Sequence, residues 1–100
     1  MINIVLFCAG GMSTSLLANK MRQAAQERGL EVTVEAYPMT QLEVIGPTAD
    51  IILLGPQIRH QKGKVTAALP EKPMAVIDMA AYGMIDGKKV IDQVCGVLGL

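Results

Sequence analysis

Apolar residues near the start of this chain follow two different periods, and each period predicts one kind of element. Residues 3–7 (NIVLF) form an apolar, β-branched run that ends at Cys8 and two nearby glycines, which is typical of a buried strand entering a tight loop. From Ser13 onward, apolar residues recur at helical spacing until Gly29 ends the pattern. Residues 31–37 (EVTVEAY) then alternate apolar and polar residues and predict a second strand. Together these elements form one strand-helix-strand unit.

The rest of the chain continues this alternation of strands and helices. Two further buried strands are predicted at residues 50–54 (DIILL) and 74–77 (MAVI), because each is a short apolar run next to a proline or glycine. Short helices are predicted at residues 40–45 and 62–69. A last helix is capped by Asp86. Its apolar stripe consists of Val90, Ile91, Val94, Val97 and Leu98.

Strict alternation of strand and helix predicts an α/β fold with three layers, in which helices cover both faces of a four-stranded parallel sheet. We expect the strand order 2-1-3-4. Ligands bind such sheets beyond the carboxyl ends of the strands, where the order reverses, and here that point lies between the first and third strands. Cys8 ends one of these strands and Gly55 follows the other.

Length and charge narrow the possible functions. A chain of 100 residues fits a single domain over residues 1–100. Nine basic and nine acidic residues cancel, so we expect no nucleic acid partner. The apolar runs are far shorter than the roughly 20 residues of a membrane-spanning helix, so we expect no direct membrane insertion. The start of the chain does not resemble an export signal, and we expect a cytoplasmic protein.

The chain has two cysteines, Cys8 and Cys95. In a reducing cytoplasm neither is expected to form a structural disulfide. With a single histidine and no third thiol, no metal site is expected. Cys95 falls beside the apolar stripe of the last helix and is interpreted as a core residue.

The segment after the first strand carries the candidate chemistry. It joins the end of a strand to the start of a helix, where unpaired backbone N–H groups and the helix dipole favour an anion. Two glycines let successive N–H groups converge, and a run of hydroxyl side chains adds donors. We predict that Cys8 is a nucleophile that takes up a phosphoryl group. The predicted phosphate-binding residues are Ala9, Gly10, Gly11, Met12, Ser13, Thr14 and Ser15.

Other interpretations of this segment are possible. In the simplest of these interpretations, Cys8 is a small apolar residue at the end of a strand, and the glycines merely make a turn. The motifs of nucleotide and dinucleotide loops are absent. A cysteine phosphatase would carry an arginine where this chain has Thr14, and such an arginine binds the transferring group with two hydrogen bonds. Its absence favours a phosphocysteine that persists, as a carrier needs.

Four runs of sequence, LFCAGGMSTSLLANKMR, EAYP, DIILLGPQI and VIDMAAYG, occur in this order from near one end of the chain to the other. In these runs the chain resembles the enzyme IIB component of the lactose/cellobiose class of the bacterial phosphoenolpyruvate-dependent sugar phosphotransferase system. The cellobiose and chitobiose branch is the more similar one. Enzyme IIB components share their fold with low-molecular-weight tyrosine phosphatases, so the resemblance implies that fold as well.

The resemblance also implies a function. Cys8 would receive a phosphoryl group from a histidine of enzyme IIA and donate it to a sugar, such as cellobiose or chitobiose, carried by the membrane enzyme IIC. No cofactor is implied. The alternatives are a low-molecular-weight cysteine phosphatase and a regulatory domain of the same fold within a larger protein, against which the short chain argues.

Five residues outside this loop are further candidates for a role at the site. Gln57 and Ile58 follow the third strand, so we expect them beside the Cys8 loop, in contact with the phosphoryl group or a partner, although a simple loop is an equal alternative. His60 is interpreted as a solvated residue rather than a base for Cys8. Asp78 is either a cap or an acid, and the role of Tyr82 stays open.

Overall fold

The computed structural model describes residues 1–8 and 12–100, with only the backbone of residues 12 and 13. Its centre is a four-stranded sheet in the order β2-β1-β3-β4, in which every neighbouring pair is parallel. The strands are β1 (Ile2–Cys8), β2 (Val32–Pro38), β3 (Ile51–Leu54) and β4 (Met74–Val76). The expected sheet and strand order are confirmed.

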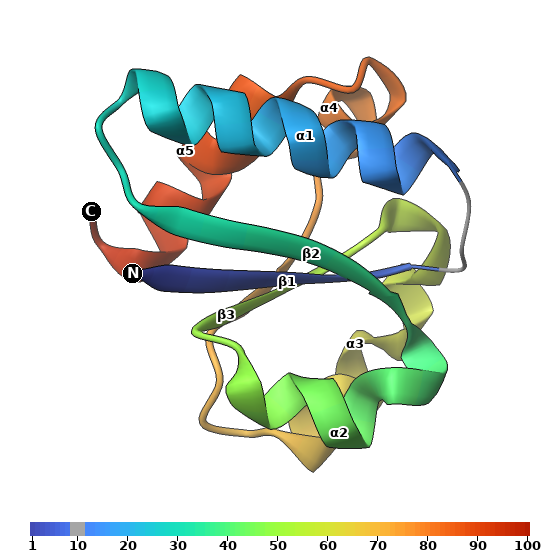
Figure 1. Ribbon diagram of the computed structural model, residues 1–100. Helices are drawn as coiled ribbons and strands as arrows, with labels where there is room; N and C mark the ends of the chain where they lie inside the picture. Colours follow the sequence, from blue (N-terminus) through green and yellow to red (C-terminus); the bar gives the residue numbers. More distant parts are fainter. Residues whose placement is uncertain (9–11) are drawn as a thin grey trace.

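Helices cover both faces of this sheet (Figure 1). One face carries α1 (Met12–Glu27), α4 (Met79–Gly83) and α5 (Gly87–Leu98). The other carries α2 (Leu42–Ile45) and α3 (Lys62–Ala68), together with the 3-10 turns η1 (Met39–Gln41), η2 (Gly46–Thr48) and η3 (Pro56–Gln61). The helix α4 was not predicted, because five residues are too few to show a helical period. Among the described helices, none has both the length and the apolar content that crossing a membrane requires.

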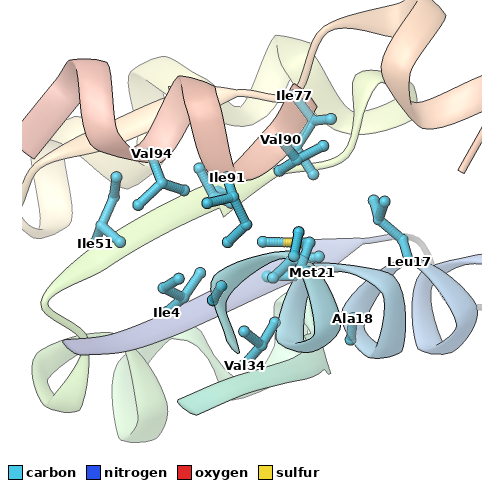
Figure 2. Close-up of a cluster of buried hydrophobic side chains, with 14 of the residues drawn as sticks. Ile4, Leu17, Ala18, Met21, Val34, Ile51, Ile77, Val90, Ile91 and Val94 are labelled. Atoms are coloured by element: carbon cyan, nitrogen blue, oxygen red, sulfur yellow. The ribbon is translucent and has the colours of Figure 1, made fainter. Parts of the chain in front are cut away.

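Each face of the sheet has its own apolar core, and β1 contributes to both. Ile4 and Leu6 pack towards α1 and α5, whereas Val5 and Phe7 pack towards the opposite helices. Successive residues of a strand point to opposite faces, so a central strand buried on both sides is apolar throughout. Figure 2 shows the first of these cores, in which side chains of α1, α5 and the sheet interdigitate. Cys95 is buried in the same core, as predicted.

The two long helices pack closely because α5 begins with a glycine. A Cβ at Gly87 would lie 2.3 Å from the backbone carbonyl carbon of Lys20. The backbone of α5 therefore lies directly against the backbone of α1 at this point. Asp86 caps α5 by accepting a hydrogen bond from the backbone N–H of Lys89 (3.1 Å), as the sequence predicted. The contact between Gly87 and Lys20 positions α1, which begins at the candidate site.

Candidate active site

Cys8 is the last residue of β1, one of the two central strands, and its side chain is 6% exposed. Gly55 lies next to it at the end of β3, because Phe7 pairs with Leu54 and the Gly55 N–H donates to the Phe7 carbonyl (2.9 Å). The two residues thus meet where the strand order reverses. This is the place where α/β sheets of this class bind ligands.

The absence of a side chain at Gly55 leaves room for Gln57 beside Cys8. A Cβ at position 55 would lie 3.6 Å from the Cys8 Cβ and 2.7 Å from the Gln57 Oε1. Gln57 therefore folds back over Gly55, which is the neighbour of Cys8. Contact of Gln57 with a phosphoryl group stays a prediction.

Ile58 requires a correction. Its side chain is 7% exposed and packs in the core that contains Val5 and Phe7. A side chain directed into this core is not available for a phosphoryl group or a partner. The turn η3 thus directs two neighbouring residues oppositely, Gln57 to the surface and Ile58 to the interior. The sequence of this 3-10 turn did not indicate which of the two side chains would point to the interior.

Thr14 and Tyr82 are joined by a hydrogen bond between their hydroxyl oxygens, which are 2.9 Å apart. Thr14 lies in the first turn of α1 and is 1% exposed, whereas Tyr82 belongs to α4 and is half-buried. The contact links the start of α1 to a segment 68 residues away. Both residues stood out in the sequence, but their pairing did not.

The remaining residues of the predicted phosphate-binding segment are described unevenly. Ala9, Gly10 and Gly11 lie outside the described residues. The backbone of Met12 and Ser13 opens α1, and Ser15 is exposed in its first turn. The N-terminus of α1 therefore begins four residues after Cys8, and its positive dipole end favours an anion there. This part of the prediction stays a prediction.

A small pocket of about 260 Å³ opens beside the site. It is bounded by the start of η3 and by α4, and its lining residues are Pro56, Gln57, Met79, Tyr82 and Gly83. Met79 is 62% exposed, so an apolar side chain lies at the surface here. Gln57 lines the pocket and also lies against Gly55, the neighbour of Cys8. Tyr82 lines the pocket and is also hydrogen-bonded to Thr14 of α1. The pocket depends on α4, which sequence analysis missed.

Asp78 and His60 each have a neighbouring hydrogen-bond partner in the structure. The Asp78 carboxylate accepts a hydrogen bond from the backbone N–H of Ala81 (3.0 Å) and caps α4. This confirms the interpretation of Asp78 as a cap. His60 is exposed, with its Nε2 3.3 Å from the Nε2 of Gln61. Within residues 1–8 and 12–100 there is no group of His, Cys, Asp and Glu side chains suited to a metal ion.

Residues 3–93 match the protein family described as "PTS system, Lactose/Cellobiose specific IIB subunit". The chain belongs to this family. The resemblance found in the sequence is thereby confirmed, and the chain is a component of a sugar phosphotransferase system. As an enzyme IIB component it takes part in phosphoryl transfer during sugar uptake.

Individual relatives agree with the family and differ in the sugar named. The galactose-specific EIIB component of Lactococcus lactis subsp. cremoris is 42% identical over 95 residues, which cover 88% of each chain. The cellobiose-specific EIIB component of Lactococcus lactis subsp. lactis is 41% identical over the same length, again 88% of each chain. A third relative, the lactose-specific EIICB component of Lacticaseibacillus casei, is 28% identical over 64% of this chain, which is 11% of that protein.

Solved structures confirm the fold. The cellobiose-specific IIB component of Borrelia burgdorferi superposes with a TM-score of 0.77 and 32% identity, over 96% of this chain and 90% of that one. A low-molecular-weight protein tyrosine phosphatase from Bacillus subtilis superposes with a TM-score of 0.63 over 98% and 97% of the two chains. At 14% identity the phosphatase shows a shared fold alone. The expected likeness to this phosphatase fold is confirmed.

Proposed function

We propose that Cys8 is the residue of this enzyme IIB component that carries the phosphoryl group, as a phosphocysteine. The observation that carries the proposal is the position of Cys8 at the end of a central strand, four residues before the N-terminus of α1. The other cysteine, Cys95, is buried in the core between helices and sheet. Sulfur at the end of β1 is therefore the nucleophile placed where an anion is stabilised.

The first step of the proposed reaction loads the protein. The Cys8 thiolate attacks the phosphorus of a phosphohistidine of enzyme IIA, so that an S–P bond forms while the N–P bond breaks. The histidine nitrogen leaves with the electron pair of that bond. Backbone N–H groups of the loop and of α1, with the hydroxyl groups of Ser13, Thr14 and Ser15, stabilise the charge on the phosphoryl oxygens.

The second step unloads it. A hydroxyl oxygen of a sugar bound by the membrane enzyme IIC attacks the phosphorus, an O–P bond forms, and the S–P bond breaks. The electron pair of the S–P bond returns to Cys8 as a thiolate, and the sugar hydroxyl gives its proton to a base of the enzyme IIC site or to water. Cys8 is then ready to be loaded again.

The partners and the sugar are part of the proposal. In the lactose-specific relative from Lacticaseibacillus casei, the name EIICB places both components in one protein, which supports enzyme IIC as the acceptor partner. We propose that residues 1–100 act as one phosphocarrier domain in the cytoplasm, with enzyme IIA as donor. The proposed sugar is a β-linked disaccharide such as cellobiose or chitobiose, which the cellobiose-specific relatives support.

Thr14 separates this function from that of a phosphatase with the same fold. The signature of those phosphatases has an arginine six residues after the cysteine, and this chain has Thr14 there, buried and bonded to Tyr82. A threonine hydroxyl donates one hydrogen bond and carries no charge, so it cannot replace the guanidinium that binds a phosphoryl group with two. A carrier needs the phosphocysteine to survive until the acceptor arrives.

The experiment is to load the protein and locate the phosphoryl group. The wild type, Cys8→Ala and Cys95→Ala are incubated with phosphoenolpyruvate and the purified upstream carriers of the system, including enzyme IIA, and are analysed by intact-mass spectrometry. We expect one phosphoryl group on the wild type and on Cys95→Ala, and none on Cys8→Ala. An undiminished adduct on Cys8→Ala would refute the assignment of Cys8.

A further inference from the structure

The side chain of Thr14 has an unusual environment for a residue of a phosphate-binding segment. It is 1% exposed, so water does not compete for its hydroxyl, and its hydrogen-bond partner at 2.9 Å is the hydroxyl of Tyr82. Hydrogen bonds shielded from water are electrostatically stronger than exposed ones. The orientation of the Thr14 hydroxyl is therefore set by a residue of α4.

We propose that Tyr82 is a positioning residue for phosphoryl transfer, which acts by donating a hydrogen bond to Thr14 so that the Thr14 hydroxyl donates its own proton to the phosphoryl group on Cys8. This inference rests on the proposed function of Cys8. Tyr82 does not touch the phosphoryl group in this arrangement. It determines which way the proton of Thr14 points.

The direction of the bond decides which of the two hydroxyl groups keeps a free proton. Each hydroxyl has one proton and two lone pairs, so the bond between Thr14 and Tyr82 uses one of the two protons and leaves the other free. Either hydroxyl can donate in this pair. Because a phenol is more acidic than an aliphatic alcohol and is the stronger donor, we assign Tyr82 as the donor and Thr14 as the acceptor. The free proton then belongs to Thr14, in the first turn of the helix that begins at the phosphate-binding segment.

Without Tyr82, the Thr14 hydroxyl loses the hydrogen bond that fixes its rotation. A freely rotating hydroxyl points its proton in several directions, and only some of them face the phosphoryl group. The Tyr82 proton on a lone pair of Thr14 restricts this rotation, so that the orientation is fixed before the phosphoryl group arrives.

Tyr82 also lines the pocket beside Gln57 and Met79, which offers a competing explanation for any effect of its loss. The ring forms the wall of the pocket, and the hydroxyl is bonded to Thr14. Tyr82→Phe keeps the ring and removes only the hydroxyl. The proposal therefore predicts a lower rate of transfer without weaker docking of enzyme IIA.

The test measures steady-state phosphoryl transfer from phosphorylated enzyme IIA through the protein, with excess enzyme IIC and its sugar present to unload Cys8, and kcat and KM for enzyme IIA are determined separately. For Tyr82→Phe we expect kcat to fall about 3- to 10-fold, the effect of one neutral hydrogen bond, with KM unchanged. Thr14→Val removes the donor itself, and kcat should fall about 100-fold. Thr14→Ser keeps the hydroxyl and should restore most of the rate.

The decisive measurement is the double variant. If Tyr82 acts through Thr14, adding Tyr82→Phe to Thr14→Val should cause no further loss, whereas independent effects would multiply. Tyr37→Phe is the matched control, because Tyr37 packs on the opposite face of the sheet and its variant should transfer at the wild-type rate. Thermal unfolding of all variants reports whether each one folds.

The outcomes separate this inference from the function on which it rests. An unchanged kcat in Tyr82→Phe, a rise in KM alone, or multiplicative losses in the double variant would overturn the role of Tyr82 and leave the phosphocysteine intact. A wild type that takes up no phosphoryl group on Cys8 would overturn both. Loss of rate matched by Tyr37→Phe would also count against a specific role of Tyr82.

Discussion

Gln57 covers Gly55 so closely that a Cβ at position 55 would lie 2.7 Å from the Gln57 Oε1. The same Cβ would lie 3.6 Å from the Cys8 Cβ, which is an ordinary contact. A larger residue at 55 would therefore displace Gln57 and leave Cys8 in place. Gly55 and Gln57 are two positions apart in the chain, and the close approach between them determines what lies beside Cys8.

Gly55→Ala is expected to slow transfer with little loss of stability. Its backbone is extended (φ −60°, ψ 148°) and suits any residue, and the displaced atom is the end of a flexible side chain, so we expect under about 1 kcal/mol of destabilisation. If the Gln57 amide donates to the phosphoryl group, phosphoryl transfer should fall on the order of tenfold. Thermal unfolding and the transfer assay measure the two effects.

The control for this prediction is Gln57→Ala. It should slow transfer as much as Gly55→Ala, and the combined variant should be no slower than either. Wild-type rates in Gln57→Ala would show that the amide makes no contribution, and a slow Gly55→Ala would then need another cause.

Gly87→Ala is expected to destabilise the fold, because the atoms that the new Cβ would meet belong to the backbone of α1. The new Cβ would lie 2.3 Å from the Lys20 carbonyl carbon and 2.5 Å from the Met21 nitrogen, so α1 and α5 must move apart. Overpacking of this kind costs about 1 to 3 kcal/mol. For a chain of this size each kcal/mol lowers Tm by roughly 4 to 8 °C.

Gly96→Ala in the same helix is the matched control. A Cβ at Gly96 has nothing within 4 Å, and alanine is the better helix former by about 1 kcal/mol, so its Tm should rise. Equal Tm values for the two variants would contradict the close contact between α1 and α5.

The protein is expected to hydrolyse aryl phosphates barely at all. Thr14 supplies one uncharged donor where a phosphatase of this fold has an arginine, and losing a single comparable donor already costs on the order of 100- to 1000-fold in rate. Turnover of p-nitrophenyl phosphate by wild type and Cys8→Ala measures this. Fast turnover that disappears in Cys8→Ala would mean that the protein is a phosphatase rather than a carrier.

Much of this fold was readable from the sequence because its signals are local. The unbroken apolar run of β1 and the helical spacing after it predicted a strand that enters a loop and then a helix, and the structure confirms both. Alternation of these elements with right-handed crossovers leaves few sheet orders, and the expected order is the one observed. Asp86 was identified as a cap for the same reason, because capping depends on residues three apart.

The residues of the candidate site were predicted from the sequence only in part. Cys8 at the end of a central strand was predictable from its position between an apolar run and glycines, and the structure confirms that position. Ile58 was assigned to the site and instead packs in the core, because a turn of 3-10 helix has no period that separates inward from outward residues. The helix α4 was not predicted, because its five residues are too few to show a helical period.

The sequence by itself determined the strands, the long helices and the position of Cys8 at the end of a strand, all of which depend on residues within a few positions of one another. Only the tertiary structure decided that Tyr82 holds Thr14, 68 residues away, and that Gly87 lies against Lys20. Such contacts arise when packed layers bring distant segments together, and they leave no periodic signal along the chain. The surroundings of Thr14 and Gln57 therefore came from packing, and the place of Cys8 from the local pattern of residues.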